Sequence, residues 1–179
     1  RYFLYPNIIM RKEDINILMQ EDVWNLIGRQ WMLITAGTSE KFNTMTASWG
    51  GIGWLWNKPV AFVFIRPERY TYQFVEESDC LTLSFFSEKY RKALQICGTV
   101  SGRDCQKVEK AGLTPVCVSE GVVGFEEARL TLVCRKLFKT SMAEEAFIDK
   151  SVLSQWYNNQ PGGSFHDIYV LEIEDALTQ

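Results

Sequence analysis

The chain has 179 residues, 46% of them hydrophobic and 23% charged, with a formal net charge of -3. This length and this ordinary composition suit one globular domain with a sizeable core. The slight negative charge provides no general attraction to nucleic acid or to an anionic membrane, so we expect neither as a partner. No apolar run reaches the ~20 residues that span a bilayer, and the first residues lack the features of a secretory signal, so we expect a cytoplasmic protein.

The cysteines, the histidine and the glycines exclude several kinds of site. The five cysteines are odd in number and none forms a Cys-x-x-Cys pair, which argues against a disulfide framework, a redox dithiol and a zinc knuckle. The single histidine, His166, cannot supply a site that needs two imidazoles. There is no Walker loop and no Gly-x-Gly-x-x-Gly motif. We therefore expect no metal site and no Rossmann-type nucleotide site.

The first half of the chain alternates between strand and turn signals. Residues 1–30 have apolar residues near helical spacing and predict a lead-in segment, either a covering helix or an extended stretch, before a domain of residues 31–179. A strand is predicted at 31–36, and the small and polar residues of 42–51 predict a loop. Residues 59–65 are too few for a helix and rich in β-branched and aromatic side chains, which predicts a buried strand. Pro67 suits the first position of a short helix, 67–77.

The second half continues with alternating strands and short helices. Six or seven strands with four short helices, joined by connections of varied length, favour an antiparallel sheet over regular βαβ winding. These patterns leave a barrel and a sandwich as alternatives. The predicted elements are a strand at 81–85, a helix at 87–98 capped by Ser87, a helix at 104–112 capped by Asp104, two strands within 116–138, a helix near 152–156 and a strand at 166–174.

The region from 42 to 72 carries the clearest chemistry. Its first part offers backbone N–H groups and the hydroxyls of Thr44, Thr46 and Ser48. Arg66 and Arg69 then supply forked donors for phosphate oxygens, and a helix beginning beside them would add its free N–H groups. This combination suits a phosphorylated aromatic ligand. The alternative is a Ser/Thr-rich hairpin beside a surface arginine turn.

Two ordered motifs resemble those of a known family. Asn-x-Met-Thr-Ala-Ser-Trp at 43–49, followed by Arg-Pro-x-Arg-Tyr-Thr at 66–71, resembles the flavin reductase-like, FMN-binding split-barrel family, which includes flavoredoxin-type proteins. Further matches lie at 83–86, at 90–94, and at 101–104 with Lys107. The flavin-binding residues that the resemblance implies are Asn43, Thr44, Met45, Thr46, Ala47, Ser48, Trp49, Arg66, Arg69, Tyr70, Thr71, Ser101 and Lys107.

The resemblance also implies a fold, a cofactor and an assembly. The fold would be mainly β with flanking helices, an antiparallel split β-barrel of the FMN-binding type. FMN would be the cofactor, with NADH or NADPH as hydride donor. A homodimer is expected, in which the partner subunit completes the pocket.

The single histidine and three tryptophans are further candidates. His166 is either a structural histidine at a strand edge or a group near the flavin, and Leu171 stands where the family usually has glycine. Trp49 would form a wall of the flavin pocket. Trp54 and Trp56 are expected in core or interface packing.

The chemistry needs no catalytic side chain if a flavin carries it. Main-chain N–H groups at Thr46, Ala47 and Ser48 would stabilise the negative charge of the reduced ring. The first functional hypothesis is an NAD(P)H-dependent flavin reductase, and the second is a non-enzymatic electron carrier that holds FMN permanently. The third is a β-barrel interaction domain without flavin.

Overall fold

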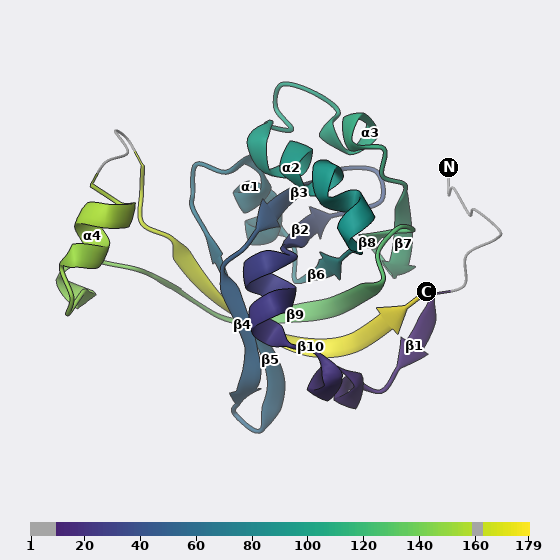
Figure 1. Ribbon diagram of the computed structural model, residues 1–179, viewed down its shortest axis with the longest axis horizontal. Helices are drawn as coiled ribbons and strands as arrows, with labels where there is room; N and C mark the ends of the chain where they lie inside the picture. The colour runs from purple at the N-terminus through teal and green to yellow at the C-terminus, as the bar shows by residue number, and fades with distance from the viewer. Residues whose placement is uncertain (1–9, 159–162) are drawn as a thin grey trace.

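The structure is a computed structural model that describes residues 10–158 and 163–179 (Figure 1). Its body is one large sheet in the order β3-β2-β6-β9-β10-β5-β4, with β1 added on β10. Every strand pairing is antiparallel, which confirms the antiparallel prediction. The strands of this sheet are β1 (Arg11–Glu13), β2 (Met32–Gly37), β3 (Phe42–Ala47), β4 (Gly50–Leu55), β5 (Lys58–Ile65), β6 (Cys80–Phe85), β9 (Leu130–Ser141) and β10 (Asp167–Thr178).

A small second sheet and four α-helices flank the main sheet. β7 (Pro115–Ser119) and β8 (Val122–Phe125) form a hairpin. Because β9 begins at Leu130, the range 116–138 contains residues of three strands, whereas the sequence predicted two. The helices are α1 (Tyr70–Glu77), α2 (Arg91–Thr99), α3 (Lys107–Ala111) and α4 (Ser151–Trp156). Within the described residues, no helix has the length and apolar character needed to cross a membrane.

The core lies between the curved sheet and its flanking helices. Val63, Ile65 and Leu83 from the middle strands belong to one large cluster with Phe74 of α1. A second cluster packs α2 against β2 and β8 through Leu33, Leu94 and Phe125. The predicted buried strand at 59–65 is confirmed by β5, because Val60, Ala61, Val63 and Ile65 are fully buried.

The predicted loop at 42–51 is wrong. This stretch forms β3 and the first residues of β4, paired with β2 and β5. Its hydroxyls are used inside the sheet: Thr44 Oγ1 lies 2.8 Å from Thr35 Oγ1 of the neighbouring strand. Cross-strand pairing and burial therefore override a composition that by itself is typical of turns.

Three helix starts differ from the prediction. Residues 67–69 form a turn, with Arg69 N donating to Arg66 O at 3.0 Å, so α1 begins three residues later than expected. Neither Ser87 nor Asp104 is an N-cap with a side-chain bond, and α3 begins after Gln106. A cap signal marks a boundary only when the following residues also find packing partners.

The two tryptophans of the β4–β5 hairpin, Trp54 and Trp56, are not in the core. Trp54 is 69% exposed and Trp56 is 55% exposed. Trp56 and Asn57 form the hairpin turn with positive φ angles of 52° and 61°. The core interpretation of Trp54 and Trp56 is therefore wrong, and the interface interpretation stays a prediction.

The described part of the lead-in segment packs on the sheet. β1 pairs with the end of β10, and Leu26 and Ile27 are buried in the large cluster. They lie in a turn of π-helix, Trp24–Arg29, that contacts β4. The division into a segment 1–30 and a domain 31–179 stays a prediction.

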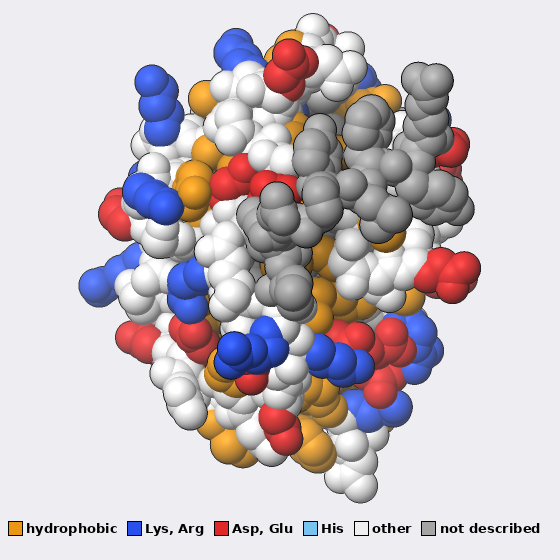
Figure 2. Space-filling model, turned by 90° about the vertical axis from the view of Figure 1, so that its right-hand side faces the viewer, with side chains coloured by type: hydrophobic (Ala, Val, Ile, Leu, Met, Phe, Trp, Pro, Cys, Tyr) orange, Lys and Arg blue, Asp and Glu red, His pale blue; other side chains and the backbone are white. Residues whose placement is uncertain are grey.

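The charged side chains are dispersed on the face seen in Figure 2. Lysine and arginine lie among aspartate and glutamate there, with apolar patches between them. Among the described residues on this face, no extended basic surface suits a nucleic-acid backbone.

Candidate functional site

Three segments that are distant in sequence meet beside β3. They are β3 itself, the corner at 66–71 that leads into α1, and residues 98–107, which run from the end of α2 to the first residue of α3. Asn43 Nδ2 donates to Thr71 Oγ1 at 2.8 Å, and Arg69 Nη2 donates to Gly98 O at 3.4 Å. The two motifs singled out in the sequence therefore lie next to each other.

Gly98 allows the end of α2 to lie directly against β3. A Cβ atom at this position would lie 3.2 Å from Thr46 Cβ, closer than ordinary packing allows. Thr46 also donates from Oγ1 to Leu94 O of α2. The side chain of Thr46 is thus held between strand and helix, and its neighbours Ala47 and Ser48 are half-buried.

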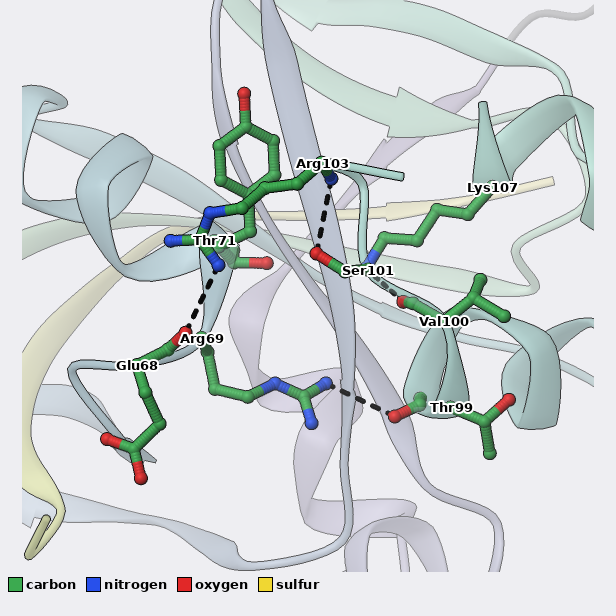
Figure 3. Close-up of a pocket in the computed structure, with 10 residues that line it drawn as sticks. Glu68, Arg69, Thr71, Thr99, Val100, Ser101, Arg103 and Lys107 are labelled. Carbon is green, nitrogen blue, oxygen red and sulfur yellow. Dashed lines mark hydrogen bonds between the residues drawn. The ribbon is translucent and has the colours of Figure 1, made fainter. Parts of the chain in front are cut away.

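A cavity of about 180 Å³ opens between the corner at 66–71 and residues 98–107 (Figure 3). It is smaller than the ~300–1,000 Å³ of typical small-molecule pockets, so it suits one end of a ligand rather than a whole flavin. Its lining includes three cations and one carboxylate. The predicted site residues among its lining are Arg69, Tyr70, Thr71, Ser101 and Lys107.

Lys107 is the most unusual of these residues. It is only 4% exposed, and its Nζ donates to Cys97 O at 3.2 Å and to Val100 O at 3.4 Å. Burial lowers the pKa of Lys107 to about 8. Burial also lowers the pKa of Arg69 from its ordinary value. Within residues 10–158 and 163–179, neither cation pairs with a carboxylate.

This donor set fits an anionic group such as a phosphate. Burying a cation without a counter-charge is costly, and a bound anion offsets that cost with charge-assisted hydrogen bonds. Ser101 lies on the loop between the two cations, and its Oγ accepts from Arg103 N at 3.2 Å. Arg103 also donates to Glu68 O at 3.3 Å and stacks over Tyr70, with 4.7 Å from its Cζ to the ring centroid. Arg103 thereby positions both the loop and the Tyr70 ring.

Arg66 does not line this cavity. Its guanidinium lies 5.1 Å from the ring centroid of Tyr157, and its Nη2 donates to Trp156 O at 3.0 Å. Arg66 Nη1 also lies 3.9 Å from a carboxylate oxygen of Glu68. The structure therefore separates the two arginines that the sequence grouped together: Arg69 faces the cavity and Arg66 faces α4.

The side chains of Asn43, Thr44 and Met45 are mostly engaged within the protein. Thr44 is fully buried and Met45 belongs to the large core cluster. Asn43 is 6% exposed and lines a second cavity next to the first. Any contact of Thr44 or Met45 with a ligand would thus have to come from the main chain.

Trp49 and His166 form a separate aromatic group near α4. The Trp49 ring centroid lies 5.3 Å from that of His166 and 5.2 Å from that of Trp156. His166 is buried, and a hydrogen bond of 2.8 Å joins its Nδ1 to Tyr157 Oη. Burial lowers the pKa of His166 to about 4, so the imidazole is neutral at pH 7.

Sequence reasoning assigned no role to three of the residues around the cavity. Glu68 and Arg103 line it, and Gly98 supplies the carbonyl that holds Arg69. Arg103 lies inside the matched stretch 101–104, which was the one available signal. The contact of Gly98 with Thr46 is tertiary, and no local pattern indicates it.

The comparisons with known proteins bear on the family and the fold of this chain. The family model described as "Flavin reductase like domain" matches residues 24–179. No curated protein sequence matches the chain. Several solved structures do, although each is less than 25% identical in sequence, so their likeness establishes the fold alone.

Three of these structures define the architecture. An FMN-binding domain of a flavin reductases-like enzyme from Shewanella baltica OS155 has a TM-score of 0.65 and 13% identity, over 95% of this chain and 77% of that one. Flavoredoxin from Methanosarcina acetivorans has a TM-score of 0.63 and 20% identity, over 84% and 68%. A putative flavin reductase with a split barrel domain from Shewanella frigidimarina NCIMB 400 has a TM-score of 0.64 and 16% identity, over 88% and 72%.

The open antiparallel sheet agrees with the split-barrel prediction. Within the described residues its two end strands, β3 and β4, follow each other in sequence but are not paired. The gap between them lies at Ser48 and Trp49, inside the first of the two motifs. By its sequence match over residues 24–179 and by its fold, this chain belongs to the flavin reductase-like family.

Proposed function

We propose that the protein binds FMN and acts as an NAD(P)H-dependent flavin reductase. The observation that supports this most is that the half-buried Arg69 and the buried Lys107 line one small cavity, and neither forms an ion pair with a carboxylate among the described residues. The family match adds the expectation of a flavin.

The phosphate end of FMN would occupy the cavity. Arg69 and Lys107 would hold it through charge-assisted hydrogen bonds, with the hydroxyls of Ser101 and Thr71 as further partners. Tyr70, fixed by Arg103, would form the wall beside the sugar chain. Arg66 would contribute indirectly, by holding α4 through Tyr157 and Trp156.

The ring end would lie against the gap between β3 and β4. There Ala47 and Ser48 would offer main-chain N–H groups, and Trp49 would form a wall. When bound, the flavin supplies the redox chemistry between a nicotinamide and an acceptor. The neutral His166 behind Trp49 would help to exclude water and charge from that side.

A homodimer is part of the proposal. α4 is carried away from the body on the ends of β9 and β10 (Figure 1), and Trp49, Trp54 and Trp156 are 42%, 69% and 45% exposed. Large exposed aromatic side chains are typical of interfaces. A second copy would cover them and complete the ring pocket. The cytoplasmic location predicted from the sequence stays a prediction.

The assembly can be tested by light scattering. We expect a mass of twice the 20.7 kDa of one chain, and a shift to the monomer in Trp54→Glu. Trp24→Glu is the matched control, because Trp24 is 87% exposed in the lead-in segment. A monomeric wild-type protein would contradict the dimer.

The reductase activity is tested by anaerobic mixing of the FMN-loaded protein with NADH or NADPH. We expect loss of the oxidised flavin absorbance with at least one of the two donors. A loaded protein that stays oxidised with both would instead be an electron carrier. A purified protein that binds no added FMN would contradict both hypotheses and leave the interaction domain.

A further inference from the structure

The segment between β9 and β10 has a small core of its own. We call its described residues, 142–158 and 163–166, the arm; they include α4, which lies at a distance from the sheet in Figure 1. The rings of Phe147, Tyr157 and Phe165 pack on one another, with centroids between 5.1 and 5.6 Å apart. Leu153 of α4 is also buried. The arm therefore packs as a unit of its own, whose position depends on how it is attached to the rest of the protein.

One attachment lies at the gap between β3 and β4, where the flavin ring is proposed to bind. Trp49 contacts Trp156 of the arm there, with ring centroids 5.2 Å apart and ring planes at 86° to each other. Two nearly perpendicular indole rings form the sides of a corner, and both are partly exposed, at 42% and 45%. Such a corner offers stacking and edge contacts to a flat ring such as nicotinamide.

The other attachment lies at the corner 66–71. Glu68 Oε1 accepts a hydrogen bond from Ser164 N at 3.2 Å, and Glu68 Oε2 accepts one from Ser164 Oγ. Arg66 Nη2 donates to Trp156 O of the arm at 3.0 Å. Two parallel hydrogen bonds to one carboxylate fix the direction of the bound segment as well as its distance. Glu68 therefore sets the orientation of the arm where it meets the corner.

The Glu68 side chain serves the arm rather than the anion site. The side chains of Glu68 and Arg69 diverge in Figure 3, although the two residues are neighbours in the chain. Burial raises the pKa of Glu68, but the hydrogen bonds from Ser164 and the nearby Arg66 outweigh it and hold the pKa below its ordinary value of 4.5. The carboxylate that holds Ser164 is thus charged at pH 7.

We propose that Glu68 is a positioning residue for the hydride donor: through Ser164 it holds the arm so that Trp156 and Trp49 form the corner that the nicotinamide enters. This inference rests on the proposed function and adds a residue that acts on the donor without touching it. Hydride transfer needs the donor and the flavin ring ~3–3.5 Å apart in a defined orientation. A loosened arm would therefore weaken donor binding and leave the phosphate end of the flavin unaffected.

The test is Ser164→Asp, which places a second carboxylate opposite that of Glu68 and repels the arm. We expect the KM for the nicotinamide donor that reduces the wild-type protein to rise about tenfold. The dissociation constant for FMN should stay within about twofold, because Ser164 does not line the cavity. The matched control is Ser154→Asp on the same arm, since Ser154 is exposed and its Oγ donates within α4, to Ser151 O at 2.9 Å.

A double variant separates this role from general damage to the arm. Adding Glu68→Gln to Ser164→Asp replaces the repelling carboxylate with an amide, whose N–H group can donate to the new aspartate. The KM should then return to within about threefold of the wild-type value. In the protein without flavin, amide hydrogen exchange in residues 142–158 should rise in Ser164→Asp and fall back in the double variant.

The outcomes distinguish this inference from the function on which it rests. An unchanged KM in Ser164→Asp would overturn the role of Glu68 and leave the proposed function intact. So would a raised KM that the double variant does not restore, or FMN binding that weakens as much as donor binding. If neither NADH nor NADPH reduces the FMN-loaded wild-type protein, the proposed function fails, and the role of Glu68 in donor binding fails with it.

Discussion

Replacing Lys107 with Met should weaken FMN binding by about 1–3 kcal/mol, or roughly five- to 150-fold, because it removes a charge-assisted hydrogen bond to the phosphate. Met keeps most of the buried volume, so the fold should survive. Arg69→Ala should have an effect of similar size. Titration calorimetry with FMN measures both. The control is Lys110→Met on the same helix, since Lys110 is exposed and lines neither cavity. Unchanged affinity in Lys107→Met would remove Lys107 from the site.

The same variant has a second readout in the protein without flavin. The folded-state pKa of Lys107, about 8, lies below its ordinary value of 10.5. Between these values the unfolded chain binds more protons, so this lysine makes the free energy of unfolding rise with pH. Cys97 acts in the opposite direction, since burial raises the pKa of its thiol from 9.0 to about 11.

Between about pH 8, the folded-state pKa of Lys107, and pH 9, the ordinary pKa of the Cys97 thiol, the effect of the lysine on stability is not opposed by that of the cysteine. There we expect the wild-type protein to gain up to ~1.4 kcal/mol of stability as the pH rises, and Lys107→Met to show no such gain. Urea unfolding at several pH values measures the difference. Parallel pH profiles of the two proteins would show that Lys107 is not a desolvated cation.

Replacing Asp167 with Ala should cost about 1–3 kcal/mol of stability, because a buried carboxylate loses its charge-assisted hydrogen bonds. The Asp167 side chain is 6% exposed at the start of β10. It accepts hydrogen bonds from Ser141 Oγ at 2.5 Å and from Tyr72 Oη at 2.6 Å, and Lys139 Nζ lies at 3.3 Å. Its removal would leave the half-buried hydroxyl of Tyr72 in α1 and the exposed side chains of Ser141 and Lys139 in β9 without their acceptor. Denaturant unfolding measures the loss.

The matched control is Glu174→Ala on the same strand. Glu174 pairs with Arg135 Nε at 2.7 Å, but both side chains are about 40% exposed, at 39% and 44%. Exposed pairs contribute ~0–1 kcal/mol, so this change should be nearly neutral. Equal losses in the two variants would contradict the stabilising role assigned to the hydrogen bonds of Asp167.

The stability that Asp167 provides should also depend on pH. Burial raises the pKa of Asp167, but the hydrogen bonds from Ser141, Tyr72 and Lys139 outweigh it and hold the pKa below its ordinary 3.8. A carboxylate with a lowered folded-state pKa stabilises the protein above its unfolded pKa, and this stability is lost as the pH falls through the folded value. Asp167→Ala should therefore lose less stability than the wild-type protein on acidification below about pH 4.

Much of the fold follows from local patterns. The apolar run at 59–65 predicted β5, and the alternation at 81–85 predicted β6. A strand that is buried on both faces has a continuous run of apolar residues, and a strand that is buried on one face has apolar residues at every second position. The stretch at 42–51 misled because the Thr and Ser hydroxyls that suit a turn also suit a buried pair such as Thr35–Thr44. Nothing local distinguishes the two.

The arginine corner shows the same limit for the site. Arg66 and Arg69 are three residues apart and chemically identical, and the sequence assigned both to a phosphate. The turn at 66–69 sends one side chain to α4 and the other to the cavity. Which of them meets an anion depends on Tyr157 and Gly98, residues that lie about 90 and 30 positions away in the chain.

The sequence by itself determined the antiparallel character of the sheet, the absence of a Rossmann-type motif, and the two motifs that identify the family. Only the tertiary structure decided that Arg69 and Lys107 line one cavity, that Arg66 does not, and that a second cavity adjoins the first. Strand patterning and motifs are local properties of the chain. The cavity exists because Gly98, Gly102 and β3 approach one another across some fifty residues, and such an approach leaves no local signal.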